Sequence, residues 1–537
     1  MTEVRRVFKV NGKPFFPIGG QSASSSAYND SESEPAFKAV KVLHGNTLLT
    51  DVYWEQVEPE EGKFDFTSVD NLLAMARRYG IKLILLWFAT WKNGNMDYAP
   101  EWVKTNPKRF KRALAANRSD LWVLSSYCRA NLEADKKAFT AFCKHLKAKD
   151  NTEHTVIGIQ VENEPAIAGT DRDYCPEAQV VFDSPVPAKV MAAMKAAGKG
   201  EVYDIWQRAG GKKSGTWPEI FGWPAGEIVS AWSIATYIDS VAEAGKAVHD
   251  IPMYINSAVV GGGWRGPIPD EVSGSGQGVS KVLDIYKWVT PHVDLIATDI
   301  KMADARTFDA VCATYSRDDN PLFMPETPPT MFLFRAIADY NLIGYHRMAG
   351  LETIVADDGS VRPGAEVGVD IIRCAAAVIP LLLKYQGTGK IYAIIQEEYT
   401  AQQLLNLEGY LGRIQFGGGP SVGIGRDWRH NIARDMNWGT IVNKDRGYGL
   451  VIQANRDEFY LAGVNYRLFL TPRLSPDKPQ SLMFQDNTVH TRQLRVDEGH
   501  FDTNGKFVVD RRRNGDNVSG GLWVEADIGV LRVITCD

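Results

Sequence analysis

The stretch that decides the fold is SVDNLLAMARRYGIKLILLWFATW, residues 68–91. Its first half spaces apolar side chains three and four positions apart, with Ser68 in front, arginines near the end and Gly80 behind. This pattern predicts an amphipathic helix from about Ser68 to Gly80. Residues 81–91 are almost continuously apolar, which is typical of a strand buried on both faces of a parallel sheet. A helix leading directly into such a strand indicates a βαβ unit.

The same alternation of helix and strand extends over about the first 350 residues. Eight strand-like runs are expected, at residues 14–20, 46–54, 81–91, 155–164, 251–258, 293–300, 321–326 and 341–346. Eight parallel, continuously apolar strands favour an α/β fold of the closed (β/α)8 barrel type over an open sheet. Functional residues are then expected where the strands end, because the loops that follow the strands build the site of such a barrel.

The units of the expected barrel are uneven, and a β-rich region follows them. A long stretch rich in Gly, Pro and Trp predicts an insertion at about residues 168–228, which either shapes the barrel mouth or serves only as decoration or an oligomer contact. Beyond residue 388, short alternating strands with Gly, Asn and Asp turns predict an antiparallel β-sandwich. The expected domains are a catalytic barrel over residues 1–388 and a β-rich domain over residues 389–537.

Net charge and cysteine content indicate which partners and which cellular location to expect. The chain has 537 residues and a net charge of −5 at neutral pH. No basic excess exists to neutralise phosphates, so neither nucleic acid nor a membrane surface is an expected partner. Six cysteines at scattered spacings, without a C-x-x-C pair, predict free buried thiols. No signal peptide or membrane span is visible, so a cytoplasmic protein is the default expectation, although a secreted chain without its signal would read the same.

Two of the expected strands end in a glutamate. The fourth, IQVENE, delivers Glu164, and the seventh, PLFMPE, delivers Glu326. One strand-end glutamate is more often only solvated. A pair at the same end of a barrel suits glycoside hydrolysis, in which one carboxyl protonates the leaving oxygen while the other attacks the sugar or activates water. Asn163 adds an amide that can bind a sugar hydroxyl, and Glu162, which alternates with Glu164, is expected as a buried partner inside the barrel.

Longer stretches carry a resemblance to a known family. WEQVEPEEGKFDFTSVDNLL (54–73) resembles a block of the family 35 and 42 β-galactosidases. LWFATWKNGNMDYAPEWVK (86–104) and RGYGLVIQANRDEFYLAG (446–463) resemble a bacterial branch of family 35-like enzymes with a DUF5597-type C-terminal domain. The NEP after the fourth strand and the PE of the seventh look like the barrel superfamily of retaining β-glycosidases. The resemblance covers most of the chain.

The resemblance implies roles for individual residues. It makes Glu164 the general acid/base and Glu326 the nucleophile, and it places Asn163 on the 2-hydroxyl of the sugar. Asp51, at the end of the second strand, is expected to bind sugar hydroxyls. The residues expected to line the pocket of the terminal sugar are Trp87, Trp91 and Asn93. For the two tryptophans, packing in the core is the competing interpretation.

Two strand ends depart from the family pattern. The sixth strand reads TDIK (298–301) where the family often has PDIY, so Lys301 replaces a tyrosine that usually supports the nucleophile. The eighth strand reads GYHRM (344–348) where the family tends to have GFSPF. This change is expected to bring Tyr345 and His346 to the mouth, with Tyr345 as a substrate contact. These departures leave the sugar preference open.

The function expected from the sequence is a retaining exo-β-glycosidase. The first choice is a β-D-galactosidase that releases galactose from oligosaccharides of plant polysaccharides. An exo-β-glucosidase, β-mannosidase or β-glucosaminidase is the nearer alternative, and a non-catalytic carbohydrate-binding barrel is the more distant one. The nine histidines show no ligand spacing such as H-E-x-x-H, so no metal and no organic cofactor are expected. The sequence leaves a homo-oligomer open.

Overall fold

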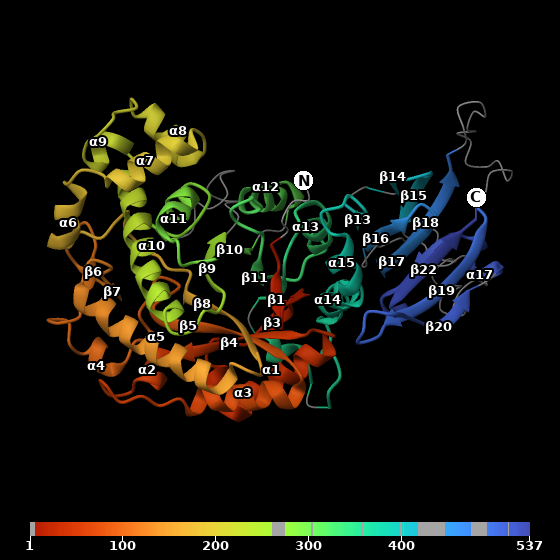
Figure 1. The fold of residues 1–537 in the computed structure, drawn as a ribbon, viewed down its shortest axis with the longest axis horizontal. Helices are drawn as coiled ribbons and strands as arrows, with labels where there is room; N and C mark the ends of the chain where they lie inside the picture. The colour runs from red at the N-terminus through yellow and green to blue at the C-terminus, as the bar shows by residue number, and fades with distance from the viewer. Residues whose placement is uncertain are drawn as a thin grey trace.

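The computed structural model consists of a helix-covered barrel and a β-rich domain beside it (Figure 1). The structure describes residues 6–259, 274–301, 304–348, 350–356, 358–397, 400, 402–416, 446–473, 491–513 and 515–536. In this part of the chain, no helix is both long and apolar enough to cross a membrane. All six cysteines are free, five of them buried and Cys536 exposed.

Eight parallel strands form the barrel, in the order β10-β9-β8-β5-β4-β3-β12-β11. They are β3 (Ile18–Gln21), β4 (Thr47–Tyr53), β5 (Lys82–Lys92), β8 (Val156–Asn163), β9 (Met253–Val259), β10 (Leu295–Ile300), β11 (Met324–Thr327) and β12 (Tyr345–Arg347). The two end strands meet, because the N–H of Thr298 in β10 donates to the carbonyl oxygen of Phe323 at 3.2 Å, directly before β11. The predicted (β/α)8 barrel is confirmed.

Helices follow the barrel strands and surround the barrel (Figure 1). They are α1 (Asp30–Val42), α3 (Thr67–Tyr79), α5 (Arg129–Asp150), α10 (Ala225–Lys246), α11 (Leu283–Val289), α12 (Ala305–Tyr315), α13 (Leu333–Asp339), α14 (Glu366–Ala377) and α15 (Ile379–Tyr385). Helix α3 begins at Thr67 and not at Ser68, because the Asp65 carboxylate accepts the Thr67 N–H at 2.9 Å. It ends at Gly80, whose φ of 65° suits a residue without a side chain.

Smaller elements close one end of the barrel and enlarge the other. The hairpin of β1 (Phe8–Val10) and β2 (Lys13–Phe15) lies at the amino ends of the barrel strands, where the Phe8 ring packs 5.3 Å from Phe323. After the carboxyl ends come α2 (Trp54–Val57), α4 (Glu101–Lys104), β6 (Arg112–Leu114), β7 (Asp120–Leu124), α6 (Pro176–Phe182), α7 (Ala188–Ala197), α8 (Glu201–Arg208) and α9 (Trp217–Phe221). Four of these, α6 to α9, lie in the stretch read as an insertion.

The C-terminal region contains two antiparallel sheets, as predicted. Six strands run in the order β13-β16-β17-β22-β19-β20 and four in the order β14-β15-β18-β21. Their bounds are β13 (Ile391–Ile395), β14 (Gln402–Leu407), β15 (Tyr410–Phe416), β16 (Tyr448–Asn455), β17 (Glu458–Val464), β18 (Tyr466–Pro472), β19 (Gln493–Phe501), β20 (Phe507–Arg513), β21 (Leu522–Val524) and β22 (Val530–Thr535). A separate apolar core contains residues of both sheets, including Ile414 and Leu468 with Leu461 and Leu531.

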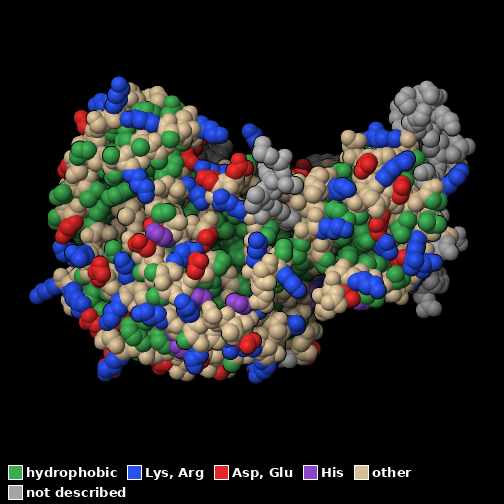
Figure 2. All heavy atoms as spheres, in the orientation of Figure 1, with side chains coloured by type: hydrophobic (Ala, Val, Ile, Leu, Met, Phe, Trp, Pro, Cys, Tyr) green, Lys and Arg blue, Asp and Glu red, His purple; other side chains and the backbone are tan. Residues whose placement is uncertain are grey.

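The first sheet also packs against the barrel. Buried side chains of β16 and β17, among them Leu450 and Ala462, belong to the same apolar cluster as the barrel core. At this contact the ring of Phe334 in α13 stacks on Tyr448 in β16, with centroids 5.7 Å apart. On the face shown in Figure 2, acidic and basic side chains are interspersed over both parts of the molecule.

Candidate active site

The two candidate glutamates lie close together at the carboxyl ends of the barrel strands. Glu164 directly follows β8, and Glu326 is part of β11. Both side chains are buried, with exposed fractions of 5% and 7%. Carboxylate oxygens of Glu164, Asp299 and Glu326 lie within 4.8 Å of one another. Three acidic groups at this spacing repel one another unless positive charge or protons balance them.

Lys301 supplies that positive charge. Its Nζ lies 2.8 Å from Oε1 of Glu164 and 3.2 Å from Oε1 of Glu326, so one ammonium group bridges both candidate glutamates. Burial alone would lower the pKa of Lys301, but the carboxylates of Glu326 and Glu164 outweigh it and raise the pKa above its ordinary value. The three carboxyl groups are of a type that can hold a cation, and here an ammonium group occupies the position between two of them.

Asp299 is the third acidic group and is fully buried. Its Oδ2 accepts a hydrogen bond from Nδ2 of Asn256 at 2.7 Å, while its Oδ1 has no donor in the part of the chain that the structure describes. Burial raises the pKa of Asp299 well above its usual range, and the nearby charges of Glu326 and Glu164 raise it further. Asp299 therefore holds a proton more tightly than an exposed aspartate does.

A chain of amides fixes the end of β8. Oδ1 of Asn163 accepts from Nε2 of Gln160 at 3.0 Å and from Nδ2 of Asn256 at 3.2 Å, and its Nδ2 donates to Oδ1 of Asn93 at 2.7 Å. Oδ1 of Asn256 accepts the backbone N–H of Glu164 at 2.9 Å. The structure thus joins Asn93 and Asn163, both expected at the site, and leaves one amide hydrogen of Asn163 for a ligand.

The end of β8 does not follow strand alternation, and this corrects the prediction for Glu162. Residues Glu162 and Glu164 have φ values of 67° and 43°, in the left-handed region. Glu162 faces the helices and not the barrel interior. Its carboxylate accepts the backbone N–H groups of Thr90 and Trp91 at 3.2 and 2.7 Å and adjoins Asp135 of α5. Period-two alternation requires extended backbone, so it fails at these two residues.

Two family models match parts of the chain. Residues 30–206 match the family 42 glycoside hydrolase model, described as β-galactosidase, and residues 373–525 match the domain of unknown function DUF5597. The chain is a glycoside hydrolase, and it is similar to family 42 over residues 30–206. No curated protein matches it.

Solved structures resemble the hydrolase only distantly. The catalytic domain of a β-amylase from Paenibacillus polymyxa is 13% identical, with a TM-score of 0.47, and the match covers 67% of this chain and 98% of that one. A β-galactosidase from Marinomonas ef1 is 10% identical, with a TM-score of 0.45 and coverage of 67% and 60%. An exo-β-1,4-mannosidase from Opitutaceae bacterium strain TAV5 is 15% identical, with a TM-score of 0.41 and coverage of 70% and 62%. The hydrolase thus spans less than two thirds of the last two.

Asp51 of the hydrolase lies at the end of β4, where it was expected. It is 1% exposed, and Tyr53 donates its hydroxyl to Oδ2 at 3.3 Å, while no described residue forms a hydrogen bond to Oδ1. Burial raises the pKa of Asp51 well above its usual range, against the opposing charge of Lys92, and Glu326 lies close enough to contribute. A buried acidic oxygen without a donor suits a sugar hydroxyl as its partner.

The two tryptophans of β5 do not line the site in the way expected. The indole of Trp87 lies on the helix side of the sheet, stacked 5.5 Å from Phe142 of α5, and its Nε1 donates to Asp135 at 3.0 Å. The prediction that Trp87 lines the sugar pocket is wrong, and core packing explains this residue. Trp91 is 1% exposed and packs edge-on against Tyr237 of α10 at 5.0 Å, and no described residue accepts a hydrogen bond from its Nε1.

Tyr345 and His346 are also buried and not at the mouth. Tyr345 has no exposed surface, and its hydroxyl donates to the backbone carbonyls of Thr327 and Pro328 at 3.2 and 3.1 Å. Tyr345 therefore fixes the end of β11, and the prediction that it contacts substrate is wrong. His346 lies beside Phe323, where burial lowers its pKa to about 3, so the ring stays neutral.

Sequence reasoning missed Asp299 and Asn256 and the role of Gln160. In the sequence, each is an ordinary polar residue in or after an apolar run. The register between neighbouring strands is the signal that would have identified them. Asn256 pairs with Ala297 in the sheet, two residues before Asp299, so strand alternation directs Asn256 and Asp299 to the same face. Tyr254 belongs to the same face of β9, and its buried hydroxyl has no hydrogen-bond partner among the residues that the structure describes.

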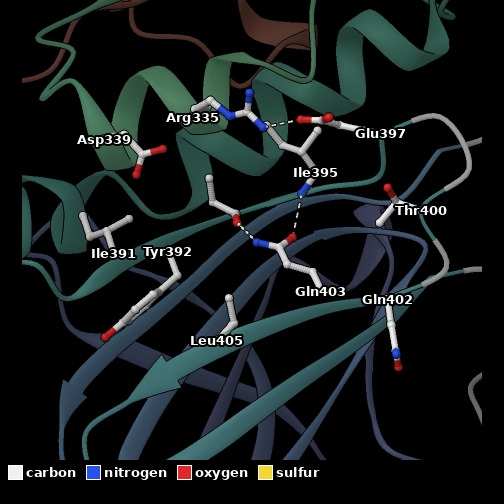
Figure 3. Close-up of a pocket in the computed structure, with 11 residues that line it drawn as sticks. Arg335, Asp339, Ile391, Tyr392, Ile395, Glu397, Thr400, Gln402, Gln403 and Leu405 are labelled. Atoms are coloured by element: carbon white, nitrogen blue, oxygen red, sulfur yellow. Dashed lines mark hydrogen bonds and ion pairs between the residues drawn. The ribbon is translucent and has the colours of Figure 1, made fainter. Parts of the chain in front are cut away.

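A separate cavity of about 400 Å³ lies between α13 and the strands β13 and β14 (Figure 3). Its polar side chains mostly bind one another: Arg335 pairs with Asp309 and Glu397, and Gln403 exchanges hydrogen bonds with the backbone of Ala393 and Ile395. None of the candidate site residues lines this cavity, so we assign the chemistry to the strand ends.

Proposed function

We propose that the hydrolase is a retaining exo-β-galactosidase that acts on oligosaccharides of plant polysaccharides. Glu326 attacks the anomeric carbon while Glu164 protonates the leaving oxygen. Water, deprotonated by Glu164, then cleaves the glycosyl-enzyme intermediate and releases the sugar with its configuration retained. The observation that carries the proposal is the closeness of the Glu164 and Glu326 carboxylates at two strand ends of the barrel.

The spacing of these carboxylates supports retention. Retaining glycosidases hold their two carboxyl groups about 5–5.5 Å apart, whereas inverting enzymes need about 6.5–9.5 Å to admit a water molecule. Oxygens of Glu164 and Glu326 lie within 4.8 Å of each other. Burial on strand ends keeps both groups in fixed positions, as double displacement requires.

Binding groups for the sugar surround this pair. Asp51 offers an unpaired oxygen, and Asn163 offers a free amide hydrogen next to Glu164. Both can take sugar hydroxyls, and we expect Asn163 to bind the 2-hydroxyl, a contact that strengthens in the transition state. The preference for galactose rests on the description of the matching family model. A glucosidase, mannosidase or glucosaminidase would use the same two glutamates.

The mechanism predicts different losses for the two glutamates. Glu326→Gln keeps the shape but removes the nucleophile, so turnover should be abolished for every aryl β-glycoside that the wild type hydrolyses. Glu164→Gln should lower kcat/KM for phenyl glycosides by about 10²–10⁴-fold, the usual contribution of a general acid. Initial rates of purified variants measure both effects. Glu58→Gln, the same change at a buried glutamate that caps the Gly62 loop, is the control and should remain active.

A screen of aryl β-glycosides tests the sugar, and nuclear magnetic resonance of the first product tests the stereochemistry. We expect the galactoside to be the best substrate and the released sugar to appear first as the β-anomer. Inactivity on the galactoside with turnover of another glycoside would reject the galactosidase assignment, and a first product of α-configuration would reject the retaining mechanism. Undiminished turnover by Glu326→Gln would reject the roles assigned to both glutamates.

A further inference from the structure

We propose that Asp299 is a positioning residue that shares one proton with Glu164, and that Lys301 decides which of the two carboxyls holds it. In the free enzyme the proton lies on Asp299, and Glu164 is a carboxylate bound to the ammonium group of Lys301. The inference rests on the proposed acid/base role of Glu164 and adds the source of the proton that Glu164 delivers.

A hydrogen bond between the two carboxyl groups requires a proton. Oxygens of Asp299 and Glu164 lie within 4.8 Å of each other, and Oδ1 of Asp299 has no hydrogen-bond partner among the described residues. Two ionised carboxylates offer only acceptor oxygens, so they can share a hydrogen bond only if one of them is protonated. Both groups are buried, which makes two unshared negative charges costly at this position.

Asn256 sets the orientation of Asp299. Its Nδ2 donates to Oδ2 of Asp299 at 2.7 Å, and its Oδ1 accepts the backbone N–H of Glu164 at 2.9 Å. One amide thus holds the Asp299 carboxyl and the Glu164 backbone in a fixed relation. Because Oδ2 accepts a hydrogen bond, the proton of Asp299 lies on Oδ1, the oxygen left for Glu164.

The surrounding charges place the proton on Asp299 in the free enzyme. Lys301 contacts Glu164 at 2.8 Å and Glu326 at 3.2 Å, and an ammonium group favours the ionised form of whichever carboxyl it touches. Among the described residues, the other titratable groups facing this cluster are Tyr254, near Asp299 and Glu326, and Asp51, near Glu326. Burial and the charges of Glu326 and Glu164 raise the pKa of Asp299, which agrees with a proton on this residue.

The proton then moves in a closed cycle. When the substrate enters and Lys301 shifts away from Glu164, the Oδ1–H bond of Asp299 breaks and an O–H bond forms on Glu164. Glu164 gives this proton to the glycosidic oxygen as that oxygen leaves the anomeric carbon and Glu326 bonds to it. In the second half, water loses a proton to Glu164 and bonds to the anomeric carbon as Glu326 departs. Glu164 returns the proton to Asp299, so no proton is gained or lost beyond hydrolysis itself.

Asp299→Asn is the matched test, because it keeps the shape and removes the transferable proton. The Asn256 hydrogen bond directs the new amide oxygen to the old Oδ2 position, so the new NH₂ group faces Glu164 and holds it as a carboxylate. We expect kcat/KM for the phenyl glycoside to fall by about 10²–10⁴-fold, the contribution of general acid catalysis. For the 2,4-dinitrophenyl glycoside we expect less than about a tenfold loss, since this leaving group departs without protonation.

The pH profile of kcat/KM is the second readout. The basic limb should move to lower pH in Asp299→Asn, which lacks the shared proton. It should move to higher pH in Lys301→Met, in which the cation favouring ionised Glu164 is gone. We expect each shift to reach about one pH unit, a tenfold change in the proton equilibrium. A residue with only a structural role would lower the height of the profile without moving its limbs in opposite directions.

The controls separate this inference from the proposed function. Thr298→Val replaces a neighbouring buried hydroxyl that has no hydrogen-bond partner and should change neither the leaving-group ratio nor the limbs. Glu326→Gln should lose activity equally on both glycosides. Unequal losses would reject the proposed mechanism, not the proton sharing alone. The shared proton would be rejected if Asp299→Asn lost kcat/KM equally on both glycosides or not at all. It would also be rejected if the basic limb of the pH profile stayed fixed in both variants.

Discussion

At the scale of single residues, the position of a side chain at a strand end depends on which face of the strand it occupies. The sequence alone does not determine that face. Glu164 and Glu326 were found from the sequence because each ends an apolar run and because a pair of carboxylates has a recognisable chemistry. Trp87 was misplaced because a strand has two faces and the register that decides between them comes from pairing with β4 and β8. Asp299 was missed because one acidic residue in an apolar strand has no pattern of its own.

The placement of Trp87 gives a prediction at this scale. Trp87→Phe removes the donor to Asp135 and should lower the free energy of unfolding by about 1–3 kcal/mol, the cost of an unsatisfied buried polar group. It should leave kcat/KM within about threefold of the wild type, because the indole lies among the helices. Urea unfolding and steady-state kinetics measure the two effects. A folded variant with normal stability and a large loss of activity would show that Trp87 belongs to the sugar pocket.

Among the elements, the junction of β5, β8, α5 and α10 fixes how the end of β8 presents its side chains. Glu162 and Asp135 meet there, with Thr90 and Tyr237 bound to the Asp135 carboxylate at 2.9 and 3.2 Å. The eight-stranded barrel followed from the sequence, because a long helix-strand alternation has few folded solutions. The turn at Glu162 did not, since left-handed φ values at glutamates leave no signal in a run of residues.

The buried acid at this junction predicts a pH dependence of stability. Burial, and then the charge of Asp135, raises the pKa of Glu162 well above its usual range. Above the ordinary glutamate pKa of about 4.3, the unfolded chain releases a proton that the folded chain retains, so the free energy of unfolding falls as pH rises toward the folded pKa. Glu162→Gln removes this contribution. Its stability should decline less from pH 5 to pH 8 than that of the wild type.

Denaturant unfolding at the two pH values tests this expectation. The quantity to compare is the change in free energy of unfolding between pH 5 and pH 8, not its absolute value, because the substitution also alters the hydrogen bonds to Thr90 and Trp91. Equal changes in the variant and the wild type would mean that Glu162 titrates alike in the folded and unfolded chain.

At the scale of the whole molecule, barrel and C-terminal domain form one packed unit. The sequence predicted both from the change in periodicity near residue 390, because a parallel barrel and an antiparallel sandwich space their apolar residues differently. It did not predict which surfaces would meet, since apolar residues on β16 and β17 look the same whether they face a sheet or a helix. The stack of Phe334 on Tyr448 is part of that shared core.

This packing predicts cooperative unfolding. Phe334→Ala should cost about 3–5 kcal/mol, the usual loss for a buried phenylalanine, and should destabilise both parts together. Calorimetry should show one transition for the wild type and one, at lower temperature, for the variant. Two separate transitions in the wild type, with only one shifted by the substitution, would show that the two domains unfold independently.

The barrel closes between β10 and β11 through few hydrogen bonds. Besides the Thr298 bond to Phe323, the N–H of Ile300 reaches Oγ1 of Thr327 at 3.3 Å, and these two strands stand at the ends of the strand order. Lys301 directly follows β10, and Glu326 lies in β11. Separating β10 from β11 would break these hydrogen bonds, which contribute about 1 kcal/mol each. The ion pair between Lys301 and Glu326 spans this junction, so we expect replacing Lys301 to weaken the barrel closure beside Glu326.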